Sequence, residues 1–144
     1  MKRFFLLIFI MLLCSCHLNN IYENEEAEKA AAEKVADEFY NFIKRQEFVQ
    51  SEVLFSSGFY KISSREDLQI LLNATNKLVG NYQSRKLIDW KTKRIEGSNP
   101  SSEYFLVYEV IYDKYPSRDT FRLVKEDGEI KIFAYNVNSE GFIR

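Results

Sequence analysis

Glu109 is the residue of this sequence whose setting comes nearest to that of a catalytic acid or base. It lies in the run EYFLVYEVIYDK, where it alternates with Phe105, Val107 and Ile111. A carboxyl group held on an apolar strand face has a raised pKa and can transfer protons near neutral pH. One register of the following hairpin instead places Glu109 opposite Lys125 as an ordinary cross-strand ion pair. We favour this structural interpretation.

Tyrosine side chains share the opposite face of the same run. Tyr104, Tyr108 and Tyr112 stand at even positions together with Leu106 and Val110. A row of this kind could line a ligand pocket. Aromatic rows of period 2 are more often plain sheet core, so core is the preferred interpretation.

Few other groups could serve catalysis, metal binding or nucleic-acid binding. The single histidine, His17, lies near the N-terminus, and the five glycines are isolated from one another. These features exclude a Ser-His pair, a histidine-rich metal set and a glycine-rich phosphate loop in the fold. Without Lys2 and Arg3 the chain carries 18 basic and 21 acidic residues, which excludes a basic field for nucleic acid. We therefore expect no cofactor, no metal and no enzymatic activity.

The N-terminus predicts export. Lys2 and Arg3 precede residues 4–13, a run without any charged or polar side chain. These are the n-region and the h-region of a signal peptide. The run is too short for a permanent membrane span, which needs about 20 apolar residues. Cys14 and Cys16 close it, and they are the only cysteines of the chain.

The stretch Leu13-Cys14-Ser15-Cys16 resembles the bacterial lipobox. The resemblance implies cleavage before Cys16, acylation of Cys16 with fatty acids such as palmitate, and an envelope protein that faces the periplasm. His17 follows where inner-membrane lipoproteins typically carry aspartate, which favours the outer membrane. We expect a signal peptide at 1–15, a lipidated tether at 16–25 and a single domain at 26–144.

Two helices are expected in the first half of the domain. An apolar stripe of period 3.6 that includes Phe39 and Phe42 predicts the first helix. The spacing of Ser63 and Glu66 matches a capping box, and Gly80 is placed to end the second helix.

The apolar period changes to 2 after Gly80. Asp127-Gly128 is a strong signal for a tight hairpin turn. Helices first and strands afterwards predict an α+β fold, with N-terminal helices packed on a four-stranded antiparallel sheet. The strands are expected near 82–95, 103–114, 119–126 and 130–138.

Apolar side chains occupy both faces of the second and fourth expected strands. In the fourth, Phe133 and Tyr135 oppose Ile130 and Ile132. An antiparallel sheet with one solvated face alternates between apolar and polar residues. We therefore expect a second copy of the chain or another envelope protein to cover the open face, unless residues 47–62 and 139–144 do so. The candidate pocket or interface residues are Tyr104, Tyr108, Glu109, Tyr112, Phe133 and Tyr135.

The segments LVGNYQSRKL, EYFLVYEVIYDK and TFRLVKEDGEIKIFAYNV resemble a bacterial family of small exported proteins known only as a domain of unknown function. Asp127, Gly128 and Tyr135 match its last segment, whereas Ile130 and Ala134 replace a tryptophan and a glycine. The resemblance covers roughly residues 27–138. It implies a cystatin-like cone fold, shared with nuclear transport factor 2 and ketosteroid isomerase, and no site residues.

These observations together predict a lipid-anchored binding or interaction module that faces the periplasm. An inhibitor or immunity lipoprotein against a cell-wall enzyme or toxin is the alternative, with the same location. An isomerase-like enzyme that uses Glu109 or a tyrosine in the cone is the least favoured of the three.

Overall fold

The computed structural model describes residues 19–143. In chain order the elements are β1 (Asn20–Glu23), α2 (Glu26–Lys44), η2 (Gln50–Leu54), α3 (Ser57–Tyr60), α4 (Arg65–Leu78), β2 (Tyr82–Glu96), β3 (Ser101–Tyr112), β4 (Ser117–Glu126), β5 (Glu129–Asn138) and η3 (Glu140–Phe142). A short strand comes first, then the helices, of which α2 and α4 are the longest, and then four long strands.

The strands form one open antiparallel sheet in the order β1-β2-β3-β4-β5. The sheet has five strands and not the four that the alternation predicts. The additional strand is β1, which lies inside the stretch expected to be a tether. Its four residues are too few to show a period, and they are extended because they pair with the end of β2, with Ile21 opposite Ile95.

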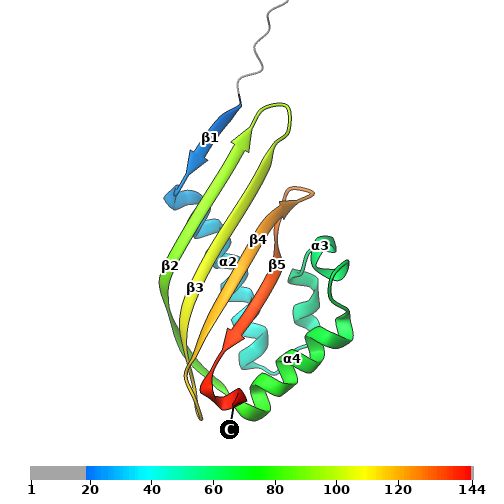
Figure 1. Cartoon of the computed structure of the whole chain (residues 1–144), viewed down its shortest axis with the longest axis vertical. Coiled ribbons are helices and arrows are strands. Elements are labelled where there is room, and N and C mark those ends of the chain that lie inside the picture. Colours follow the sequence, from blue (N-terminus) through cyan, green and yellow to red (C-terminus); the bar gives the residue numbers. More distant parts are fainter. Residues whose placement is uncertain (1–18, 144) are drawn as a thin grey trace, which may run out of the picture.

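The helices leave one face of the sheet uncovered. Figure 1 shows α2 behind the strands and α4 beyond β5, while the front of the sheet carries no helix. We call the face toward α2 the inner face and the opposite one the outer face. The packing is centred on Phe39 of α2, which is fully buried and whose ring contacts the rings of Tyr40, Phe55, Phe121 and Tyr135. The predicted apolar stripe is therefore confirmed.

Local signals in the sequence mark the ends of these elements. The capping box of α4 uses Ser64 and Asp67, one residue later than the spacing suggested. Gly80 follows the helix with φ +112°, a value that glycine adopts readily. Asp127 and Gly128 have φ values of 51° and 82°, as the tight turn between β4 and β5 requires.

The segment between α2 and α4 runs along the free edge of β5. Phe55 pairs with Ile132 in a parallel bridge, and the amide of Ser56 donates to the Ile132 carbonyl at 2.9 Å. This contact covers an edge that would otherwise be open to further pairing. It explains the ambiguous pattern of residues 47–62, which close the side of the sheet and not its outer face.

Candidate functional site

The tyrosine row of β3 lies on the inner face. Tyr104, Tyr108 and Tyr112 are only 2%, 3% and 5% exposed and belong to the core. The Tyr104 hydroxyl donates to Glu28 of α2 at 2.8 Å. Burial, aided by this hydrogen bond, raises the pKa of Tyr104 to about 12. Of the three hydroxyls, that of Tyr104 anchors α2 on the sheet. The Tyr112 hydroxyl donates to Asp119 of β4, and the buried Tyr108 hydroxyl has no hydrogen-bond partner within residues 19–143.

Asp119 of β4 is the acidic group of the inner face, and it is fully buried. Its Oδ2 accepts hydrogen bonds from the hydroxyls of Tyr135 (2.7 Å), Tyr40 (2.8 Å) and Tyr112 (3.4 Å). Its Oδ1 accepts from Ser117 at 2.5 Å. Four hydroxyl donors around one carboxyl group match the acceptor capacity of a carboxylate.

Burial raises the pKa of Asp119, and the hydrogen bonds from Ser117 and the tyrosines oppose this shift. Burial and the neighbouring Asp119 also raise the pKa of Tyr40 and Tyr135, which remain proton donors. A carboxyl group of this kind is a chemical candidate for a proton acceptor. The cavity beside Tyr112 and Tyr135 holds about 10 Å³, however, which is the space of one water molecule. A substrate has no room there.

Sequence reasoning missed Asp119, although the sequence contained a signal for it. Ser117, Asp119, Phe121 and Leu123 alternate along β4, and all four are buried. The same pattern, a carboxylate in register with apolar residues, occurs at Glu109 and at Asp119. The structure buries Asp119 and leaves Glu109 exposed.

Glu109 lies on the outer face and is exposed. It stands between Lys86 of β2 and Arg118 of β4, and not opposite Lys125 as the sequence suggested. The predicted register is wrong because β4 begins at Ser117, which pairs with Val110. Cations on both sides make Glu109 part of a charged cross-strand row.

A bulge in β5 lies at Phe133, between Ile132 and Ala134. The register shifts between Arg122 and Leu123 of β4, so that Leu123 pairs with Ile132 and Arg122 with Ala134. Ile132 and Tyr135, three positions apart, consequently both contribute to the core, and the strict alternation expected for this strand is wrong. Phe133 is half-buried, with its ring against Gly58 of α3 and 5.7 Å from the Arg122 guanidinium.

A hollow of about 410 Å³ crosses the outer face. Its floor includes Phe105 of β3 and Val124 of β4, both half-buried. Lys91, Lys93 and Arg122 stand at its walls, and none of them takes part in an ion pair within residues 19–143. The hollow thus combines an apolar floor with three cations that are free to bind an anionic group.

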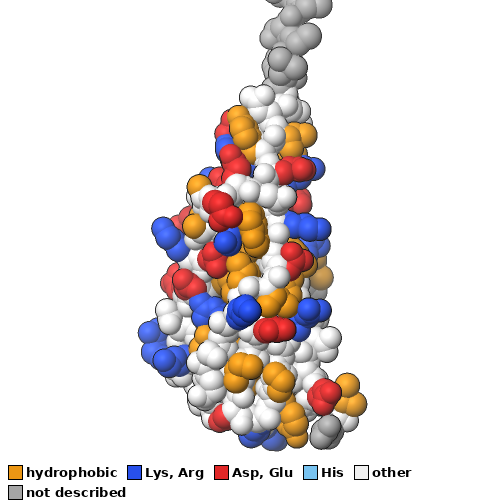
Figure 2. Space-filling model, turned by 90° about the vertical axis from the view of Figure 1, so that its left-hand side faces the viewer, with side chains coloured by type: hydrophobic (Ala, Val, Ile, Leu, Met, Phe, Trp, Pro, Cys, Tyr) orange, Lys and Arg blue, Asp and Glu red, His pale blue; other side chains and the backbone are white. Residues whose placement is uncertain are grey.

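Carboxylates border the same hollow at the end nearer the β2–β3 turn. Glu23 and Glu103 flank Lys93 on the neighbouring strands. Charges of both signs therefore alternate across this part of the sheet. Figure 2, which views the side of the molecule where β1 and β2 lie, shows hydrophobic side chains in a column between acidic and basic ones.

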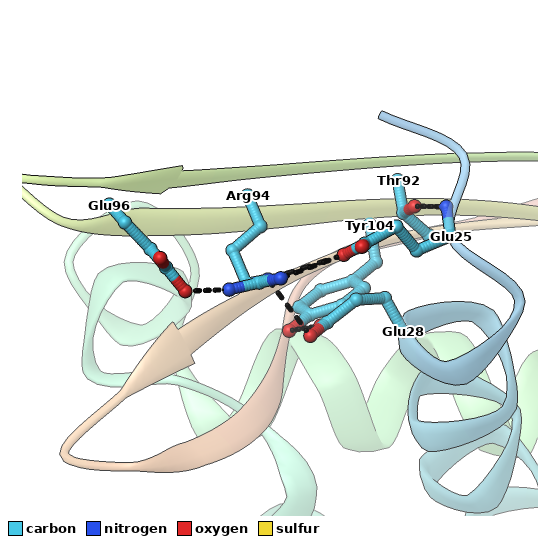
Figure 3. Close-up of polar contacts among 6 residues, drawn as sticks. All are labelled: Glu25, Glu28, Thr92, Arg94, Glu96 and Tyr104. Atoms are coloured by element: carbon cyan, nitrogen blue, oxygen red, sulfur yellow. Dashed lines mark hydrogen bonds and ion pairs between the residues drawn. The ribbon is translucent and has the colours of Figure 1, made fainter. Parts of the chain in front are cut away.

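An ionic cluster joins the N-terminal end of α2 to β2. Arg94 pairs with Glu25 (3.0 Å), Glu28 (3.3 Å) and Glu96, and its guanidinium lies 4.2 Å from the ring centre of Tyr22. Figure 3 shows how the three glutamates converge on Arg94. The cluster ties β1, β2 and α2 together beside the hollow, and its charges are already satisfied.

These features define an α+β protein whose N-terminal helices pack on a five-stranded open antiparallel sheet. No protein-family model matches the chain, no curated protein is significantly similar to it, and no solved structure matches its fold. Within residues 19–143 no group of histidine, cysteine and carboxylate side chains could hold a metal ion. None of the helices in this range is long and apolar enough to cross a membrane. The expected lipidation residue, Cys16, lies outside the described residues.

Proposed function

We propose that this protein is a lipid-anchored binding module of a bacterial cell envelope, facing the periplasm, and that it holds an envelope protein against the outer face of its sheet. The lipobox-like sequence at Cys16 supports the anchor. His17 after it favours the outer membrane. One long helix packed across a curved antiparallel sheet is compatible with the cystatin-like cone that the sequence motifs suggest.

The observation that carries the binding role is the hollow on the outer face. Lys91, Lys93 and Arg122 surround an apolar floor that no helix covers. Buried apolar contacts with charges at the rim are the usual composition of a protein interface. Glu23 and Glu103 stand beside Lys93, but none of the three rim cations forms an ion pair within residues 19–143. The partner is therefore a protein that presents carboxylates to these cations around an apolar contact.

Site-specific photocrosslinking tests this proposal. A benzophenone amino acid at Phe105, on the floor of the hollow, should give one discrete adduct in intact envelopes. The matched control is Ile70, which is 68% exposed on α4 and should give none. Absence of an adduct from position 105, or the same adduct from position 70, refutes the proposed interface.

The mass of the adduct distinguishes the partners. A product of twice the chain mass identifies a second copy of this chain and replaces the envelope-protein proposal by a homodimer. A cell-wall enzyme or a toxin in the adduct supports the inhibitor or immunity role. An adduct with any other envelope protein supports the binding module as stated.

A further inference from the structure

The sequence predicts a tether at 16–25, but the folded domain already begins within that stretch, a few residues after Cys16. β1 begins at Asn20. Asn19 is also held, because its Oδ1 accepts a hydrogen bond from the Ser98 amide at 3.3 Å. Only His17 and Leu18 separate Asn19 from Cys16.

The turn between β2 and β3 is shaped to receive Asn19. Gly97 has φ +141°, and a Cβ atom at this position would clash with the Asn19 side chain. Asn24, at the other end of β1, donates its amide to the Thr92 carbonyl at 2.9 Å. Contacts at both ends of the short strand therefore hold it in place.

This attachment limits the distance between the lipid and the domain. Three residues of extended chain span about 11 Å at most. The polar headgroup layer of a bilayer is itself roughly 5 to 7 Å thick on each side. A domain anchored through Cys16 must therefore keep the β2–β3 turn close to the headgroups.

The composition of the turn suits such a position. Residues 97–102, GSNPSS, carry no charge. The first charged residues beyond them are Glu96, which is paired with Arg94, and Glu103. A neutral polar tip can lie among headgroups, whereas burial of the flanking carboxylates in the hydrocarbon would be costly.

We propose that the β2–β3 turn rests on the headgroups of the membrane that carries the lipid, so that the domain stands end-on with the C-terminal end of α4 facing away. This inference rests on the proposed anchor at Cys16. The chain leaves the fold at one end of the long axis, and α4 ends toward the other (Figure 1). β2 has 15 residues, so these two ends are about 50 Å apart.

This end-on orientation, which we call the stance, also sets the height of the outer-face hollow above the headgroups. Lys93 and Lys91 lie four and six residues before Gly97 along β2, which corresponds to about 13 to 20 Å above the headgroups. An end-on domain presents the hollow sideways at this height. Its partner is then a protein that stands on, or reaches close to, the same membrane.

Fluorescence quenching in vesicles tests the stance on the full lipidated protein. Cys14 leaves with the signal peptide and the Cys16 sulfur is acylated, so Asn99→Cys and Lys77→Cys each introduce a single free thiol for a fluorophore. Vesicles of phosphatidylethanolamine and phosphatidylglycerol carry a headgroup nitroxide as the quencher. We expect strong quenching at position 99, in the turn, and little at position 77, at the end of α4.

A linker insertion separates the effect of the tether from any affinity of the turn for lipid. Fifteen glycine and serine residues between His17 and Leu18 add a flexible span of roughly 20 Å, and quenching at position 99 should fall several-fold. Equal quenching at both positions shows a domain lying flat and overturns the stance. Weak quenching at position 99, or no effect of the linker, overturns it as well.

A separate measurement distinguishes failure of the anchor from failure of the stance. Metabolic labelling with a palmitate analogue should label the protein, and Cys16→Ser should abolish the label. If both proteins are labelled, or if neither is, the anchor is refuted and the stance with it. Labelled protein that fails the quenching test refutes the stance alone.

Discussion

β3 has twelve residues, and its two faces differ in whether the rest of the chain covers their side chains. On the inner face Tyr104, Tyr108 and Tyr112 are buried under α2. On the outer face Glu109 is exposed between two cations, and Ile111 is 49% exposed. The inner face is thus closed by this chain alone, whereas the outer face is left to solvent or to a partner.

This difference separates stability from recognition within one sheet. The inner face combines aromatic packing with a buried carboxylate that needs all of its hydroxyl donors, so substitutions there affect folding. On the outer face, Lys91 and Arg122 stand opposite Phe105 on the two neighbouring strands, and Phe105 is only half-buried. Substitutions there should alter binding while the fold persists.

The largest expected effect is that of Phe39→Ala on the inner face. Removal of this fully buried ring should lower the free energy of unfolding by about 3 to 5 kcal/mol, since it leaves a cavity among four other rings. The measurement is chemical denaturation followed by fluorescence. Phe105→Ala on the outer face is the matched control and should cost less than half as much. Equal losses would break the distinction between the faces.

Asp119→Ala should have the next largest effect. It leaves Tyr40, Tyr135 and Ser117 without their acceptor, and each unsatisfied buried hydroxyl costs about 1 to 3 kcal/mol. We expect a loss of at least about 2 kcal/mol in the free energy of unfolding. Ser117→Ala removes one donor only and should cost about 0.5 to 1.5 kcal/mol. A neutral effect of Asp119→Ala would contradict the structural role of the cluster.

The same variant yields a pH dependence with a definite sign. The pKa of Asp119 is raised in the folded protein above its ordinary value of 3.8, so the folded state binds this proton more tightly than the unfolded state. The contribution of this group to stability is complete below pH 3.8 and is lost as the pH rises through the folded pKa. The difference in unfolding free energy between the wild-type protein and Asp119→Ala should therefore grow as the pH falls through this window. A difference that shrinks on acidification would contradict the raised pKa.

The smallest effect is expected for Arg94→Gln, whose partly exposed side chain lies between the N-terminal end of α2 and the sheet. The change removes the ion pairs with Glu25, Glu28 and Glu96 but leaves the strand pairing of β1 intact. The melting temperature should fall less than for Phe39→Ala or Asp119→Ala. Hydrogen exchange should become faster at the Asn24 amide, while amides of β4 remain unaffected. Faster exchange throughout the sheet would show that the cluster supports the whole core and would contradict a local role.

Local periodicity in the sequence was sufficient to predict most of the secondary structure. The stripe that contains Phe39, the capping signal before α4, the turn at Asp127-Gly128 and the four long strands all agree with the structure within about two residues. Each of these signals depends on side chains within a few positions of one another. The absence of any cysteine after Cys16 also follows directly from the sequence.

The strand β1, the Asp119 cluster and the register around Glu109 were decided only by the tertiary structure. The four residues of β1 are extended because they pair with residues 70 to 76 positions away in β2. Tyr40 and Asp119 are 79 positions apart and meet because α2 crosses the inner face. The first residue of β4 and the bulge in β5 determine which side chains face inward. Register and burial depend on contacts between distant segments, whereas a periodic pattern reports only on the chain near each residue.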